Sequence, residues 1–286
     1  MELRKSERSK AKIKMALQGP SGSGKTMSAL LLAQGLTNGD LTKVAIIDTE
    51  TGSSNLYSHL GSYNVLTLDN PHSPERYIQA IDVCINAGME VVILDSTSHC
   101  WNYLLDYHSS LPGNSFTNWA KITPMQKAFV DKILQSNVHI IATMRVKQDY
   151  VLSERNGKMV PEKVGLKAIQ RDEISYEFTI VFDIDSKHYA VSSKDRTLLF
   201  EGKPQFIINS HTGKRILEWC NSTMTKAELK QKVTECNNMQ ELTELFNANS
   251  DLAKIIEQDF VAKKNLLNQL TSNISSNGNG TYSHKQ

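Results

Sequence analysis

The chain has 286 residues, of which 40% are hydrophobic and 22% are charged, and its formal net charge is +2. This composition indicates a soluble globular protein with one sizeable core and room for a small second module. So low a net charge gives no argument for nucleic-acid binding from total charge, and any basic footprint must be local.

Membrane insertion and secretion are not expected. No apolar run approaches membrane-spanning length, and the charged N-terminus lacks the apolar core of a signal peptide. The four cysteines are widely spaced and form no C-x-x-C pair, which indicates reduced thiols. We therefore expect a cytoplasmic protein with no membrane partner.

The first predicted strand, residues 13–18, and a predicted buried helix at 28–33 enclose the sequence GPSGSGKT. These eight residues match G-x-x-x-x-G-K-[ST], the phosphate-binding P-loop, although a chance glycine-rich turn is the alternative. Lys25 would place a cation near the β- and γ-phosphates, and the Thr26 hydroxyl can bind Mg²⁺. ATP and Mg²⁺ are the expected cofactors. The predicted nucleotide-binding residues are Gly19, Pro20, Ser21, Gly22, Ser23, Gly24, Lys25, Thr26 and Met27.

The strand predicted next, residues 44–48, leads into Asp48-Thr49-Glu50. This places a carboxylate at the C-terminal edge of the sheet, where ligands bind in open α/β folds. There Glu50 could orient the water that attacks the γ-phosphate; the alternative is a surface acid before the turn at 51–53. We interpret Glu50 and Lys25 as catalytic, and Asp48 as a supporting or structural acid.

A later predicted strand, residues 91–95, has the Walker B pattern of an apolar run that ends in an acid. After a P-loop, such an acid holds Mg²⁺, whereas the alternative is an ordinary turn at a strand end. Thr26 and Asp95 are therefore the predicted metal-binding residues.

The remaining pattern predicts helices from Ser73 to Gly88 and from Thr123-Pro124 onward, a strand at 138–143, and two antiparallel strands at 176–185 and 189–193. The fold class is α/β, with a mostly parallel central sheet, late antiparallel strands and a small helical C-terminal module. The predicted domains are the ATP-binding core at 1–220, the helical module at 221–271 and a disordered tail at 272–286.

These features resemble the RecA-like ATPases, and within them the phage-type single-strand annealing ATPases of the Sak group. RecA-like enzymes take their catalytic glutamate from the end of the strand after the P-loop helix, which is the place of Glu50. AAA+ enzymes usually place it beside Walker B, where this chain has Asp95-Ser96. The resemblance spans about residues 13–200 and rests on Gly19–Leu32, Ile46–Glu50, Leu94–Ser96 with Trp101, Thr143–Lys147, Tyr176–Phe178 and Lys194–Arg196.

The resemblance also implies a shared active site. In RecA-like recombinases, two basic residues two positions apart reach the γ-phosphate of the neighbouring subunit. Lys194 and Arg196 match that pattern, although an exposed basic turn is the alternative. Both are predicted to be catalytic in trans, which implies a homo-oligomer with ATP at its subunit interfaces.

Two segments correspond to the DNA-contacting loops of that family. The first follows Walker B and is aromatic; the second, residues 145–171, carries seven basic and three acidic residues around the hairpin signal Asn156-Gly157. Aromatics beside a basic track hold single strands without sequence preference. The alternatives are core tryptophans and a solvated basic face, and Arg145 and Lys147 could also sense the γ-phosphate from the end of their strand. The predicted DNA-binding residues are Trp101, Trp119, Arg145, Lys147, Arg155, Lys158 and Lys163.

The sequence thus predicts an ATP- and Mg²⁺-dependent RecA-like ATPase that binds single-stranded DNA and supports annealing or recombination for a phage or prophage. A single-strand-binding protein or another replication or recombination protein is a further expected partner. Two alternatives stay open: a small-molecule kinase whose lid is the 145–171 segment, and a nucleotide-gated loader that acts through the C-terminal helices.

Overall fold

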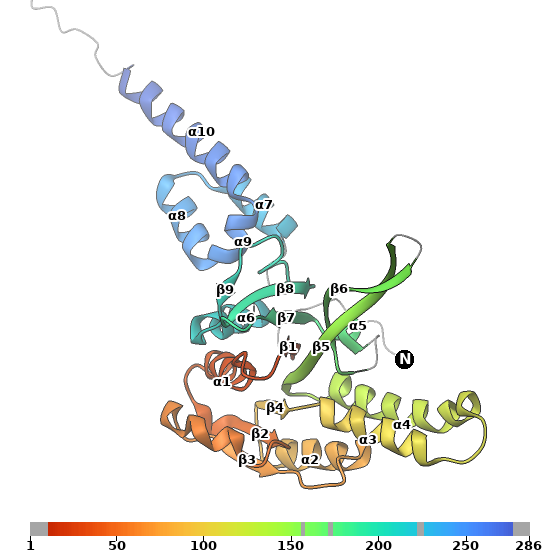
Figure 1. Cartoon of the computed structure of the whole chain (residues 1–286). Helices are drawn as coiled ribbons and strands as arrows, with labels where there is room; N and C mark the ends of the chain where they lie inside the picture. The colour runs from red at the N-terminus through yellow and green to blue at the C-terminus, as the bar shows by residue number, and fades with distance from the viewer. Residues whose placement is uncertain (1–10, 156–157, 171–173, 222–225, 277–286) are drawn as a thin grey trace, which may run out of the picture. The chain divides into compact units, whose positions relative to one another are not determined.

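The computed structural model describes residues 11–155, 158–170, 174–221 and 226–276. Contacts between residues divide the chain into two compact units, and the boundary in the sequence falls between Asn221 and Ser222. The larger unit is an α/β sheet covered by helices, and the smaller one is helical (Figure 1). No helix in the described ranges is long and apolar enough to cross a membrane.

The central sheet has the strand order β3-β2-β4-β5-β1-β7-β8-β9, and β6 pairs with β5 outside this path. In this order, the neighbouring strands β3, β2, β4, β5, β1 and β7 pair parallel. Strand β8 pairs antiparallel with β7, and β9 pairs antiparallel with β8. Strand β5 lies between the P-loop strand β1 and β4. The strands are β1 Lys14–Gly19, β2 Val44–Asp48, β3 Asn64–Thr67, β4 Val91–Asp95, β5 His139–Arg155, β6 Lys158–Ala168, β7 Ile180–Ile184, β8 Tyr189–Asp195 and β9 Phe206–Ile207.

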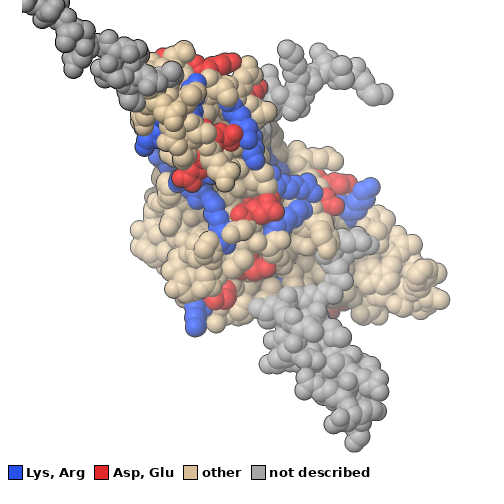
Figure 2. Space-filling model, turned by 90° about the horizontal axis from the view of Figure 1, so that it is seen from above, with Lys and Arg blue, Asp and Glu red and all other residues tan. Residues whose placement is uncertain are grey.

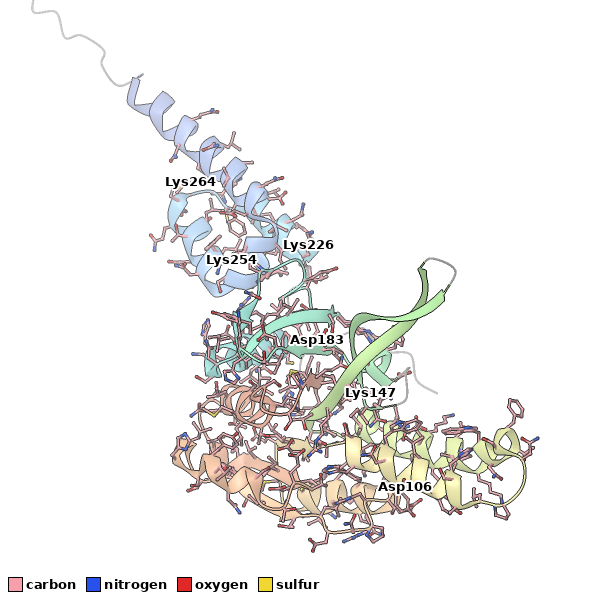
Figure 3. The ribbon with its side chains drawn as sticks, viewed as in Figure 1. Asp106, Lys147, Asp183, Lys226, Lys254 and Lys264 are labelled. Carbon is pink, nitrogen blue, oxygen red and sulfur yellow. The ribbon has the colours of Figure 1, made fainter. Side chains whose placement is uncertain are left out.

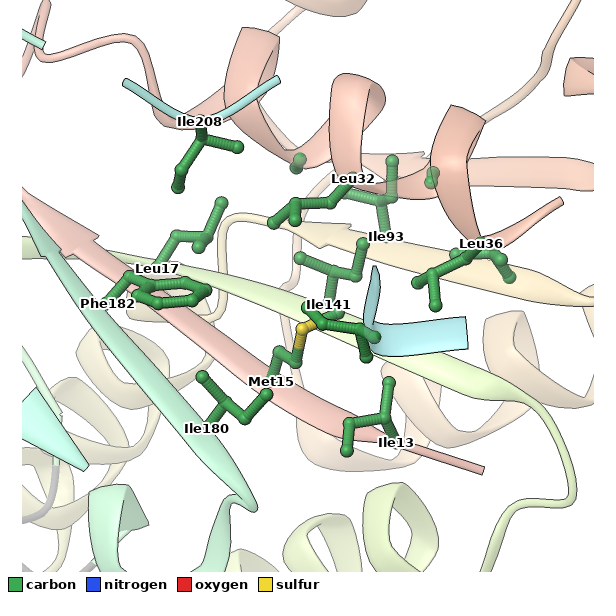
Figure 4. Close-up of a cluster of buried hydrophobic side chains, with 14 of the residues drawn as sticks. Ile13, Met15, Leu17, Leu32, Leu36, Ile93, Ile141, Ile180, Phe182 and Ile208 are labelled. Carbon is green, nitrogen blue, oxygen red and sulfur yellow. The ribbon is translucent and has the colours of Figure 1, made fainter. Parts of the chain in front are cut away.

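Helices cover both faces of this sheet, which explains why β2 and β4 are apolar and buried along their whole length. Neighbouring residues of a strand enter opposite cores: Ile46 packs with α1 and α6, whereas Ile47 packs with α2 and α4. Figure 4 shows the first core. The helices of this unit are α1 Lys25–Leu36, α2 Pro74–Asn86, α3 Ser98–Ser110, α4 Ser115–Gln135, α5 Ile174–Glu177 and α6 Ser210–Asn221, with the 3-10 segments η1 Leu41–Lys43 and η2 Ser53–Leu60.

Helices α1 and α6 cross at two glycines that the sequence pattern does not single out. A Cβ atom on Gly35 would lie 2.1 Å from the Ser210 carbonyl oxygen, and one on Gly213 would lie 2.1 Å from the Leu32 carbonyl oxygen. Both obstacles are backbone atoms and cannot swing away. The absence of side chains at these positions therefore allows α6 to lie directly on α1 and to close the core over the P-loop helix.

The basic segment forms the predicted hairpin. Strands β5 and β6 pair antiparallel, with Arg155 opposite Lys158, and the hairpin projects from the sheet (Figure 1). The turn residues 156–157 lie outside the described residues. Because β5 is continuous from the sheet into the hairpin, its inner half belongs to the core and its outer half to the projection.

Two sequence predictions about element bounds are wrong. Helix α4 begins after Asn114, whose Oδ1 accepts a hydrogen bond from Phe116 N at 2.8 Å, so Pro124 lies inside the helix rather than at its start. A proline inside a helix is unfavourable by itself. Here the buried face with Ile122 and Phe129 stabilises the helix on both sides of it.

The second correction concerns the strand expected from residue 176. Residues Ile174–Glu177 are helical, as α5, and β7 begins only at Ile180. Ile174 and Phe178 are both buried in the core. Residues four positions apart lie on one face both in a helix and in a strand. Periodicity alone therefore does not decide between the two structures here.

The smaller unit is built from short helices around its own apolar core. Asn238 caps α8, since its Oδ1 accepts from Glu241 N at 2.9 Å and a Glu241 oxygen accepts from Asn237 N at 2.8 Å. Helix α10 continues to Ser276, past the expected end of the module at 271, because extending an existing helix adds one hydrogen bond for each residue ordered. Residues 277–286 lie outside the described residues. The helices are α7 Lys226–Glu235, α8 Met239–Ala248, α9 Ser250–Ile255 and α10 Glu257–Ser276.

Candidate active site

The P-loop connects the end of β1 to the first residue of α1. Gly24 has φ +86°, a left-handed conformation that glycine adopts without strain, and Lys25 begins the helix. The N-terminus of α1 therefore faces the space where a phosphate would bind. Lys25 Nζ donates to the carbonyl oxygens of Gly19 at 2.9 Å and Pro20 at 2.8 Å, so the lysine lies folded against its own loop.

The charge of Lys25 is balanced by its surroundings. Burial lowers the pKa of the Lys25 ammonium group, while the nearby carboxylates of Asp95 and Glu50 act in the opposite direction. Arg145 adds a smaller lowering effect. A bound triphosphate would bring further negative charge to this group and favour its protonated form.

Thr26 and Asp95 are in direct contact. Thr26 Oγ1 donates to Asp95 Oδ2 at 2.7 Å, and Thr143 Oγ1 donates to Asp95 Oδ1 at 2.6 Å. Asp95 is 1% exposed, and burial raises the pKa of its carboxyl group, while the two hydroxyl donors oppose that shift. A hydroxyl and a carboxylate at the end of β4 form the oxygen donor set that suits Mg²⁺. The residues present therefore fit this ion.

Asp48 and Glu50 have different environments, although they lie two residues apart. Asp48 is fully buried and accepts hydrogen bonds from Glu50 N at 2.7 Å and from Ser54 N at 3.1 Å, so it shapes the turn after β2. The Glu50 side chain is 25% exposed and lines the same cavity as Lys25. Of the two acids, only Glu50 is placed to meet a bound nucleotide.

Arg145, one of the residues predicted to bind DNA, contacts Glu50. Its Nε and Nη2 atoms lie 3.0 and 2.7 Å from Glu50 Oε1. Its backbone N–H donates to Ser98 Oγ at 2.9 Å, and its carbonyl oxygen accepts from Ile169 N at 2.7 Å. Arg145 therefore joins Glu50 to the start of α3 and to the end of the returning hairpin strand.

These groups line one cavity of about 540 Å³ beside the P-loop. It brings the predicted residues Lys25, Thr26, Glu50 and Asp95 together with Arg145. Tyr57, His188, Ile207 and Ile208 also line this cavity. Polar and charged side chains and apolar ones therefore both contribute to its lining.

Lys194 and Arg196 are not among the described residues that line this cavity. Both side chains donate to the Tyr176 carbonyl oxygen, Arg196 through Nη2 at 3.1 Å. Lys194 lines a separate cavity of about 660 Å³, with Gln18 and Asp183. Burial and the neighbouring Arg196 lower the pKa of the Lys194 ammonium group. The hydrogen bonds that the two side chains make in the described structure go to the carbonyl oxygens of Ser175 and Tyr176 and not to the P-loop, although Gly19 lines the same cavity as Lys194.

The candidate DNA residues are distributed over two projections. Trp101 and Trp119 stack on each other across α3 and α4, with ring centroids 6.0 Å apart, and each is partly buried. Lys147 is exposed near the base of the β5–β6 hairpin (Figure 3). The side chains of Arg155, Lys158 and Lys163 lie outside the described residues. On the face seen in Figure 2, basic and acidic side chains of the described residues are interspersed.

Residues 11–227 match the family model described as an AAA domain. The chain belongs to the AAA domain family. The matched range contains every strand of the sheet and every residue that lines the 540 Å³ cavity. This AAA domain is a P-loop ATPase domain, so nucleotide binding and ATPase activity are the general functions of the site. A comparison with curated proteins finds no match.

Sequence reasoning missed several residues of the AAA domain site. Thr143 lies within β5, and its contact with Asp95 is recognisable only after β5 is placed beside β4. His188 belongs to the β7–β8 turn, which the sequence identifies only as a turn, and its ring Nδ1 lies 3.0 Å from the Ser23 carbonyl oxygen. No local pattern signals these contacts because their partners are far away in the chain.

Proposed function

We propose that this AAA domain protein is an ATP- and Mg²⁺-dependent ATPase that binds single-stranded DNA and supports DNA annealing or recombination, with turnover that the DNA stimulates. A phage or prophage is the proposed source. The ATPase part follows from the P-loop, the Thr26–Asp95 pair and Glu50 around one cavity. The DNA part is supported by the resemblance to the Sak-group ATPases and by the position of Arg145.

The observation that carries the proposal is the contact between Arg145 and Glu50. Arg145 lies where β5 leaves the sheet for the hairpin, and its side chain makes two hydrogen bonds to the carboxylate that would activate water. A ligand that moves the hairpin would therefore also move the partner of Glu50. This contact gives DNA binding at the hairpin a direct physical route to the hydrolytic site.

The chemistry follows from the charges in the cavity. While Arg145 donates two hydrogen bonds to Oε1, that oxygen is occupied and is not available to accept a hydrogen bond from a water molecule. Once released, Glu50 would take the proton of the attacking water, and Lys25 would turn from the loop carbonyls to the phosphates. Mg²⁺, held by Thr26 and Asp95, would neutralise charge on the phosphate oxygens.

Lys194 and Arg196 complete the proposal. Their charges are held outside the cavity of their own chain, by the Tyr176 carbonyl oxygen. In a homo-oligomer with ATP at its interfaces, they would face the nucleotide of a neighbouring subunit and stabilise charge on the transferred phosphoryl group. A single-strand-binding protein or another replication or recombination protein is the proposed further partner.

The test is release of inorganic phosphate from ATP, with and without single-stranded DNA, together with DNA binding at low salt. We expect slow basal turnover and about tenfold stimulation by DNA, since releasing a general base is worth at least that much. Phosphate release that DNA does not change, with no DNA binding at low salt, would contradict the proposal. A phosphorylated small molecule as product would instead identify a kinase.

Two variants make this test specific. Arg145→Ala frees Glu50 permanently, so its basal rate should rise toward the stimulated rate and DNA should no longer change it. Lys147→Ala is the matched control from the same strand, because Lys147 is exposed and is not among the described cavity residues. It should keep the basal rate and bind DNA more weakly, with a smaller dependence on salt concentration.

A further inference from the structure

The turn between β7 and β8 reaches across to the P-loop through His188. The ring Nδ1 lies 3.0 Å from the Ser23 carbonyl oxygen, and a Cβ atom on Gly24 would lie only 3.1 Å from the same nitrogen. His188 also lines the cavity that contains Lys25 and Thr26. The histidine therefore packs on the glycine that precedes the helix.

The backbone of the turn holds this histidine in a specific conformation. His188 has φ +69°, which is uncommon for a residue with a side chain. Asp185 Oδ1 accepts hydrogen bonds from Lys187 N at 2.8 Å and Tyr189 N at 2.9 Å, and His188 N donates to the Asp185 carbonyl oxygen at 3.1 Å. The turn is thus closed around His188 on both sides and presents its ring to the P-loop.

The hydrogen bond defines which ring nitrogen carries a proton. A carbonyl oxygen can only accept, so Nδ1 must be the donor. The Ser23 carbonyl and the Gly24 N–H belong to one planar trans peptide and point in opposite directions. Holding the carbonyl toward His188 therefore aims the Gly24 N–H away from His188. Because glycine tolerates either sign of φ, this peptide has little local resistance to turning over.

We infer that His188 is a positioning residue for nucleotide binding: it anchors the Ser23–Gly24 peptide so that the Gly24 N–H stays directed at a bound phosphate. The inference rests on the proposed nucleotide site and adds to it a residue outside the P-loop sequence. His188 acts through the loop backbone and needs no contact with the reacting atoms.

Substitutions at this position test the hydrogen bond separately from the fold. His188→Ala removes the donor to the Ser23 carbonyl oxygen. The binding of ADP with Mg²⁺ should weaken by about tenfold, which is the effect of losing the hydrogen bond from Gly24 N–H to a charged phosphate. His188→Asn retains an N–H donor at the same distance from the backbone and tolerates positive φ, so it should restore most of the affinity. His188→Asp offers only acceptors to a carbonyl and should bind most weakly.

The measurements are ADP affinity by calorimetry and the separate effects on KM and kcat for ATP. We expect KM to rise with the dissociation constant, while kcat changes by less than about threefold, because Glu50 and Asp95 are untouched. Lys187→Ala is the matched control, since Lys187 lies in the same turn and is exposed. It should bind ADP as the wild type does.

The outcomes are distinguishable. Wild-type protein that binds ADP, with equal affinity in His188→Ala, would overturn the inference and leave the proposed function intact. Equal losses of ADP affinity in the alanine and asparagine variants would also overturn it. Asparagine keeps an N–H donor and alanine does not, so equal losses would show that the hydrogen bond is not what matters. Wild-type protein that binds no nucleotide would overturn the proposed function and this inference with it.

Discussion

Thr26 Oγ1 donates a hydrogen bond to Asp95 Oδ2 at 2.7 Å, which joins the first turn of α1 to the end of β4. The two oxygens are thereby held at the distance from which both can serve one cation. Thr143 holds the other carboxylate oxygen, so Asp95 has one oxygen directed to the P-loop and one to β5. This arrangement makes the role of the carboxylate charge directly testable.

Replacing Asp95 by asparagine should abolish the effect of Mg²⁺ while leaving the fold intact. Because burial raises the pKa of this carboxyl group, a neutral amide of the same size should cost little stability. We expect the additional thermal stabilisation by ADP with Mg²⁺, relative to ADP alone, to disappear in a melting experiment. Thr143→Val is the control, since it removes a hydrogen bond and keeps the charge. A Mg²⁺-dependent shift retained in Asp95→Asn would contradict the assignment.

Glu50→Gln should separate nucleotide binding from turnover. The amide keeps an oxygen that can accept from Arg145 but is no longer a base, so we expect ATP affinity within about threefold of wild type and turnover lower by about 100-fold or more. Single-turnover hydrolysis and equilibrium binding measure the two effects. Turnover that survives the change would remove Glu50 from the catalytic role. Glu90→Gln, a surface acid paired with Lys43, provides the matched control.

Mixing two inactive variants tests whether the site is shared between subunits. Arg196→Ala retains a complete P-loop, and Glu50→Gln retains both basic residues. If Lys194 and Arg196 act on a neighbouring nucleotide, mixed oligomers contain some interfaces with every group intact. We expect the mixture to recover up to about a quarter of wild-type phosphate release, the share of intact interfaces in random assembly of equal amounts. No recovery in oligomers shown to exchange subunits would contradict action in trans.

Because of His139, we expect the free energy of unfolding to decrease in mild acid. It is 4% exposed, its Nδ1 accepts from Ile13 N at 3.1 Å, and burial together with Lys12 and Lys14 lowers the pKa of its ring to about 3. The unfolded chain takes up this proton near pH 6.5, whereas the folded chain resists until about pH 3. Stability should therefore fall as the pH decreases through this window, by about 2 kcal/mol between pH 7 and 5.

The comparison variant for this effect is His139→Asn. Its amide oxygen can accept from Ile13 N–H but cannot be protonated in this range. Urea unfolding at pH 7 and pH 5 should show a drop in the free energy of unfolding that is about 2 kcal/mol smaller in the variant than in wild type. Equal pH dependence in the two proteins would show that His139 does not control it. Lys14 should contribute little to this pH dependence, because the pKa of its ammonium group is lowered only to about 8, above the range from pH 5 to pH 7.

Much of the core could be predicted because its signals are local. The P-loop is a contiguous run, and β2 and β4 coincide with the apolar runs that end in Asp48 and Asp95. A strand buried on both faces must be apolar throughout, and this property needs no knowledge of its neighbours. The start of α4 was predicted wrongly because Pro124 is a local helix-start signal, and packing around Ile122 and Phe129 outweighs it.

The P-loop and the acids at the C-terminal ends of the parallel strands are recognisable from short runs of residues. What each of these groups contacts depends on the folded chain. The partner of Glu50 lies 95 residues away, in Arg145, and the partner of Ser23 lies 165 residues away, in His188. Such contacts depend on strand order and on the path of turns between strands. That order is set by the packing of both sheet faces, which no short stretch of sequence records.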